Sequence, residues 1–158
     1  MTLAFVNAAR APVKARWVRE VIAAQAAQPE VAARLPLAPW SANVRLAGDR
    51  ELRRLNARFA GEDHVTDVLS FASGDAAPAF LGDIVISWQA AQRQAQAFGH
   101  PAQVEVALLA AHGFLHLLGW DHATPREEAE MNRITLAGLS AGGLALGDGR
   151  LLDGGVPG

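Results

Sequence analysis

Residues 111–122 read AHGFLHLLGWDH, and this stretch places three histidines, His112, His116 and His122, at offsets of four and six residues. Residues four apart on a helix lie on the same face, one turn above the other. Gly119 permits the left-handed turn that ends a helix and brings the chain back. The three imidazoles are therefore predicted to converge, from a helix and the loop that follows it, as a tripod for one metal ion.

Three neutral imidazoles are a typical ligand set for Zn²⁺, and three protein ligands leave a fourth position for water. That open position is typical of a catalytic zinc site rather than a structural one. The alternative is that each histidine is a core residue whose ring nitrogens are bonded locally. Because all three share one matched spacing, we predict that His112, His116 and His122 bind a single Zn²⁺ ion.

The same histidine spacing occurs in one class of zinc proteases, in which a glutamate directly follows the first histidine and acts as general base. Gly113 occupies that position here and cannot accept a proton. The sequence therefore predicts a metal-dependent hydrolase of another kind, and a zinc peptidase is the less favoured alternative.

The run HGFLHLLGWDH closely resembles the signature of the YbeY family, the bacterial rRNA maturation factors described as metal-dependent endoribonucleases. Residues 56–71, NARFAGEDHVTDVLSF, and residues 81–87, LGDIVIS, resemble two further segments of that family in the same order. His100 and Glu105 stand where the family has a histidine and a glutamate before the metal helix. The resemblance covers roughly residues 40–137.

This resemblance implies a zinc-dependent, single-strand-specific endoribonuclease that acts in rRNA maturation, at the 3′ end of 16S rRNA, and in ribosome quality control. It implies RNA and ribosomal particles as partners, with no role for DNA or a membrane, and a cytoplasmic location. It also implies a roughly four-stranded sheet packed with about five helices and a cleft that holds the metal.

Two departures from the family pattern bear on activity. The family usually carries an arginine after the aromatic residue at Phe59, and this chain has Ala60; it usually has proline where this chain has Val65. The missing arginine is thought to serve catalysis or RNA binding. It favours a second hypothesis, a ribosome-assembly factor with a structural or weakly active metal site. The candidate replacements are three nearby arginines: Arg58, Arg53 and Arg54.

Proton transfer needs a group other than Gly113. Asp121 precedes the third histidine, so it is a candidate to orient a ligand or to accept a proton; the alternative is a turn aspartate bonded to nearby backbone. The predicted catalytic residues are thus His112, Asp121 and Arg58. Asp67 and Asp83 are further candidates for the cleft, because a carboxylate beside an apolar strand is costly to bury without a partner.

Two more residues near the metal motif have alternative roles. Trp120 can stack on a base or belong to the core or its rim. Glu105 lies two helical turns before His112 on the same face, which points it toward the site but places it too far away for direct coordination.

Hydrophobic periodicity and turn residues predict strands at residues 3–7, 42–46, 67–72 and 81–87, the last two pairing antiparallel. They predict helices at about 12–28, 49–59, 88–98, 102–118 and 125–139, with a short helix or loop within 29–40. Asp49, Ser87 and Thr124 are the expected N-caps of the second, third and fifth of these helices. The fold class is α+β, or broadly mixed α/β. We expect one domain over residues 1–139 and a glycine-rich, mobile tail over 140–158.

The composition of the chain excludes some kinds of cross-link and ligand, and it argues against secreted and membrane-spanning proteins. The chain has no cysteine, which rules out disulfides and thiolate ligands. It has neither a basic, apolar leader nor a run of about 18 apolar residues, so we expect no signal peptide and no membrane span. Residues 1–60 hold ten Arg or Lys against four Asp or Glu, whereas residues 61–158 hold four against twelve. A basic half suits phosphates, although solvated helix faces explain it equally.

Overall fold

The computed structural model describes residues 1–60, 66–74, 79–146 and 150. Its centre is a four-stranded sheet in the order β1-β2-β4-β3. The strands β1 (Thr2–Asn7), β2 (Ser41–Ala47) and β4 (Phe80–Ser87) run parallel, and β3 (Val68–Ala72) pairs antiparallel with β4 at the edge of the sheet. This mixed sheet confirms the predicted α+β fold and the antiparallel pairing.

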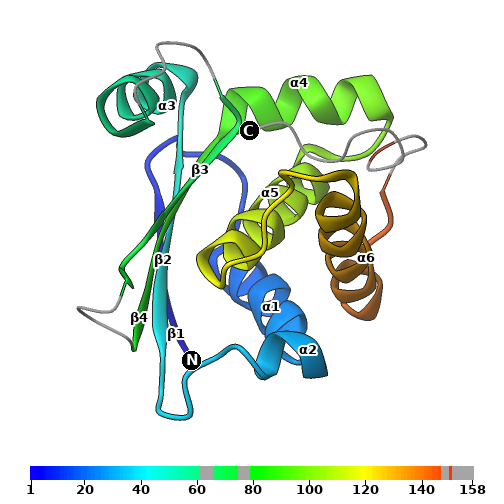
Figure 1. Ribbon diagram of the computed structural model, residues 1–158. Helices are drawn as coiled ribbons and strands as arrows, with labels where there is room; N and C mark the ends of the chain where they lie inside the picture. Colours follow the sequence, from blue (N-terminus) through cyan, green and yellow to red (C-terminus); the bar gives the residue numbers. More distant parts are fainter. Residues whose placement is uncertain (61–65, 75–78, 147–149, 151–158) are drawn as a thin grey trace.

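The helices cover the two faces of the sheet unequally (Figure 1). One face packs against α1 and α5, and α6 packs against these two helices on their side away from the sheet; α3 lies on the opposite face with a π-helical turn, η1, directly after it. The short α2 follows α1, and α4 packs along α5. The bounds are α1 (Ala15–Ala26), α2 (Pro29–Ala32), α3 (Asp49–Leu55), η1 (Asn56–Ala60), α4 (Trp88–Phe98), α5 (Ala102–Leu117) and α6 (Pro125–Ala141).

The helix α5 is the central element of the core, because it contacts the sheet and also α1, α4 and α6. Its sequence is apolar on nearly every side, as expected of a helix surrounded by protein. Two polar residues of α5 are nevertheless buried in the protein: Glu105 is 0% exposed and His112 is 2% exposed. Their burial needs a partner or a ligand, and both belong to the site described below.

Gly113 allows α5 to approach the sheet closely. A Cβ atom at this position would lie 2.6 Å from Cγ2 of Ile84 and 3.1 Å from Oγ of Ser70. The Ser70 hydroxyl also donates a hydrogen bond to the Gly113 carbonyl oxygen at 3.2 Å. Position 113 therefore faces the sheet, where the side chain of a protease-type glutamate would have no room.

We expect Gly113→Ala to destabilise the protein by up to about 2 kcal/mol. Overpacking a core costs about 1–3 kcal/mol, and the higher helix propensity of alanine returns about 1 kcal/mol. Urea unfolding gives the free-energy difference. In a double-mutant cycle, Ile84→Ala removes the opposing methyl group and should reduce the cost; an unchanged cost would show that the contact with Ile84 is not its cause.

Two predicted helix starts are confirmed and one is wrong. The hydroxyls of Ser87 and Thr124 accept backbone N–H groups in the first turns of α4 and α6. Asp49 was expected to cap α3, but Gly48 occupies that position. The Asp49 carboxylate instead accepts hydrogen bonds from the Ser87 hydroxyl and from Arg93, each at 2.7 Å, so it joins the start of α3 to α4.

The chain after residue 139 was expected to be a mobile tail. In the described part of it, α6 continues to Ala141, Leu144 and Leu146 pack against the core, and Arg150 is 5% exposed. Residues 147–149 and 151–158 lie outside the described residues, so mobility there stays a prediction. Among the described helices, none has the length and hydropathy needed to cross a membrane.

Candidate metal centre

The three histidine rings converge as predicted. The Nε2 atoms of His112 and His116 lie 2.9 Å apart, and the candidate ligand atoms of all three residues lie within 4.8 Å of one another. The ring centroid of His122 lies 5.6 Å from that of His112 and 5.0 Å from that of His116. Within the described residues, this cluster contains histidine alone and no carboxylate.

The turn after α5 delivers the third ring. Gly119 has a φ of 97°, in the left-handed region. Its N–H donates to the His116 carbonyl oxygen at 3.0 Å, and the N–H of Trp120 donates to the Leu115 carbonyl oxygen at 3.1 Å. These two bonds close the helix end in the manner that a C-terminal glycine permits. The predicted helix-and-loop origin of the tripod is therefore confirmed.

The cluster fits a tetrahedral metal ion. Zinc–nitrogen bonds of about 2.0–2.1 Å place two ligand nitrogens roughly 3.3 Å apart, which small ring rotations reach from the observed geometry. Burial, and then the neighbouring histidines, lower the pKa of His112 to about 2. Burial and His122 likewise lower the pKa of His116. Both rings are therefore neutral at pH 7, the form that binds a metal.

We expect the metal-free protein to lose stability as the pH falls from 7 to 5. The folded pKa of His112 lies below its ordinary value of 6.5, so below pH 6.5 the unfolded chain takes up a proton that the folded chain does not. This difference favours the unfolded state by about 2 kcal/mol at pH 5. Urea unfolding at both pH values, compared with His112→Asn, measures it. Equal pH dependence in the two proteins would contradict the assignment to His112.

Asp121 lies beside the cluster and holds the turn. Its Oδ1 atom accepts the backbone N–H of His122 at 2.7 Å, and its negative charge acts to raise the pKa of His116 against the larger effect of burial. The carboxylate is exposed. The turn role considered from the sequence is thus present, and the proximity to His116 keeps a proton-transfer role open.

Arg58 has a different environment. It lies on η1, where its guanidinium carbon is 5.1 Å from the centroid of the Phe59 ring, and that ring packs edge-on against Phe71. Phe71 packs against the small hydrophobic cluster around Leu52 of α3, on the face of the sheet that α3 covers. Ser70, the residue before it, points to the other face and contacts α5. No contact in the described part of the chain joins Arg58 to the histidines. Val65 lies outside the described residues.

Comparisons with known proteins agree with the geometry. A family model described as endoribonuclease YbeY matches residues 7–141. Two curated relatives of that name come from Roseiflexus sp. (strain RS-1), 38% identical over 76% of this chain and 81% of the relative, and from Gloeobacter violaceus, 53% identical over 58% of this chain and 50% of the relative. The chain belongs to the YbeY family.

The predicted enzyme class, a hydrolytic nuclease, agrees with the YbeY family. The match to the Gloeobacter relative spans half of that relative's length. A solution structure of a Thermotoga maritima protein has the same fold, with a TM-score of 0.57 and 19% identity over 88% of this chain and 90% of that chain.

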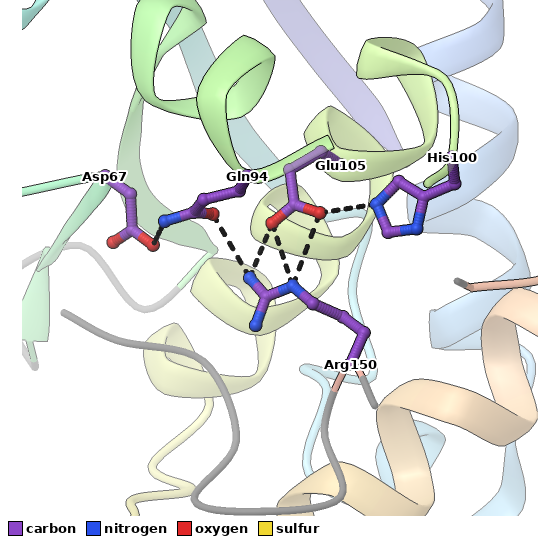
Figure 2. Close-up of polar contacts among 5 residues, drawn as sticks. All are labelled: Asp67, Gln94, His100, Glu105 and Arg150. Carbon is purple, nitrogen blue, oxygen red and sulfur yellow. Dashed lines mark hydrogen bonds and ion pairs between the residues drawn. The ribbon is translucent and has the colours of Figure 1, made fainter. Parts of the chain in front are cut away.

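The histidine and glutamate that stand at YbeY-family positions form a buried network (Figure 2). Both carboxylate oxygens of Glu105 accept hydrogen bonds from Arg150. The Oε1 atom lies 3.1 Å from Nε and 2.5 Å from Nη2 of Arg150, and the Oε2 atom lies 3.3 Å from Nε. His100 Nε2 lies 2.6 Å from Oε2. Arg150 also donates to Gln94, which donates to Asp67 at 3.0 Å. The network therefore joins the residue before β3, α4, α5 and the C-terminal segment.

Arg150 was not predicted from the sequence. The available signal was Glu105, a lone carboxylate in an apolar helix, which needs a buried cation or donor. The sequence does not say which of many arginines supplies it, because the partner lies 45 residues away. The charge of Arg150 also contributes to the low pKa of His112, so the network lies near the histidine cluster of this YbeY chain.

Two candidates from the sequence have other roles. Trp120 is only 6% exposed and the Arg34 guanidinium lies 3.6 Å above its ring, so base stacking by Trp120 is wrong and the core or rim role holds. Asp83 accepts a hydrogen bond from Asn43 at 3.0 Å and does not belong to the histidine cluster. Burial raises the pKa of Asp67, whose second oxygen has no hydrogen-bond partner in the described residues.

Proposed function

We propose that this chain is a zinc-dependent, single-strand-specific endoribonuclease that acts in rRNA maturation, at the 3′ end of the small-subunit rRNA, and in ribosome quality control. Ribosomal particles in the cytoplasm are its proposed setting. The observation that carries the proposal is the convergence of His112, His116 and His122, two of them held neutral by burial, in a member of the YbeY family.

A zinc ion at this site would supply a Lewis acid for the phosphoryl oxygen and for the attacking water or 2′-hydroxyl. His112, His116 and His122 would hold it. Asp121, exposed beside His116, is the proposed acceptor of the nucleophile's proton. Arg58 is the proposed cation for the phosphate charge if the RNA reaches η1, because Ala60 replaces the family arginine.

The test is RNA cleavage by chelator-treated protein before and after zinc is restored. We expect treated protein to lose cleavage of single-stranded RNA, zinc to restore it, and a matched duplex to be cut far more slowly. Cleavage that ignores the chelator, or that does not return with any divalent metal, would contradict a metal-dependent nuclease. Restoration by another ion alone would contradict zinc as the cofactor.

A second candidate function is a ribosome-assembly factor with a structural or weakly active metal site. Ala60 at the position of the family arginine favours it. It predicts binding of the zinc-loaded protein to ribosomal particles without cleavage of their RNA. The peptidase alternative has less support, since position 113 packs against Ile84 and cannot supply the protease base.

A further inference from the structure

A groove leads away from the histidine cluster along the edge strand β3. It consists of two adjoining hollows, of about 260 Å³ and 380 Å³, which share Ala72 and Leu117 in their walls. His116 lines the first hollow and Arg34 lines the second. One groove therefore connects a candidate metal ligand with a guanidinium group.

Arg34 is held in place by the turn that delivers the third histidine. Its guanidinium lies 3.6 Å above the Trp120 ring, and Nη1 donates to the Leu118 carbonyl oxygen at 3.3 Å. A Cβ atom on Gly119 would lie 3.6 Å from the same Nη1. A guanidinium stacked on a ring and bonded at one nitrogen is preorganised, with further N–H groups to offer a ligand.

Within the described residues, no carboxylate forms an ion pair with Arg34. By contrast, Arg45, Arg93 and Arg133 each form an ion pair with a carboxylate. Arg34 is also exposed. A planar, exposed guanidinium is well suited to bind a phosphate group, because its N–H groups match the spacing of two phosphate oxygens. The apolar walls at Leu81 and Leu117 suit the sugar or base of the same nucleotide.

We propose that Arg34 binds a backbone phosphate of the single-stranded RNA, along the groove from the metal centre. This subsite rests on the proposed function and names how the substrate is held. Arg34 lies on the α5 side of the sheet, whereas the arginines considered from the sequence, Arg53, Arg54 and Arg58, belong to α3 and η1. It is a binding residue that the sequence alone did not indicate.

The test measures binding of fluorescent single-stranded RNA analogues that resist cleavage, with phosphorothioate linkages and 2′-O-methyl groups, from dinucleotide to dodecamer, to the zinc-loaded protein. We expect Arg34→Ala to weaken binding of the longer RNAs about tenfold and to lower the slope of log affinity against log salt by about 0.7. The dinucleotide, placed at the metal end, should bind equally. Arg34→Lys should fall between the two. Arg16→Ala is the matched control, because it removes the same charge from an exposed residue on α1.

Zinc binding and the unfolding midpoint are measured for each variant. If Arg34→Ala loses zinc, or weakens RNAs of every length equally, Arg34 only supports the turn and the subsite proposal is overturned. If Arg34→Ala matches Arg16→Ala while the wild type binds and cleaves RNA, the subsite fails and the proposed function stands. If the wild type binds no RNA but binds an extended peptide along β3, both proposals fail.

Discussion

Replacing His112 with alanine is expected to abolish zinc binding and RNA cleavage together. His112 is the most deeply buried of the three rings, and its Nε2 lies 2.9 Å from that of His116. Its replacement by alanine therefore removes the innermost of the three candidate ligands. We expect zinc per chain, measured by atomic absorption, to fall from one to near zero. Cleavage should fall by more than about 10³-fold, because loss of a single electrostatic donor already costs about 10²–10³-fold.

A control must separate loss of the metal from loss of stability. Leu109 lies on the same helix and is 0% exposed, so Leu109→Ala should cost about 2–5 kcal/mol while zinc binding and cleavage at low temperature persist. Cleavage that survives His112→Ala unchanged would identify a contaminating nuclease. Zinc binding that survives it at full stoichiometry would show that the three rings do not share one ion.

Replacing Arg150 with methionine is expected to destabilise the protein by about 3–5 kcal/mol, because it leaves a buried carboxylate without its cation. Glu105 is 0% exposed and its side chain depends on Arg150 and His100 for partners. Urea unfolding gives the free energy. We expect the double variant with Glu105→Gln to recover part of the loss, because the unpaired charge is then removed as well.

The matched control is Arg133→Met. Arg133 pairs with Glu30 at 3.0 Å, but the two side chains are 59% and 40% exposed, and exposed pairs contribute about 0–1 kcal/mol. Equal, small effects of the two substitutions would mean that the C-terminal segment does not hold Arg150 against Glu105 in solution. A large effect of Arg150→Met alone would show that this segment is part of the folded unit.

The sequence predicted the features that depend on local spacing. His112 and His116 share a face because a helix repeats every 3.6 residues, and Gly119 could be assigned to the turn because few other residues adopt its conformation. The capping roles of Ser87 and Thr124 followed from the same local rules. The strand order along the chain, read from alternation and turn residues, was also sufficient for the fold class.

Contacts between distant segments were decided by the tertiary structure. Glu105 is a carboxylate in an apolar helix and therefore needs a polar partner when it is buried. Arg150 becomes that partner only because the chain after α6 returns to α4 and α5. Likewise, only the folded chain sets Arg34 above Trp120 and brings Ile84 against Gly113. Helix period and turn preference act over a few residues and are written in the local sequence. Packing, burial and long-range ion pairing depend on which surfaces meet, and that is a property of the whole folded chain.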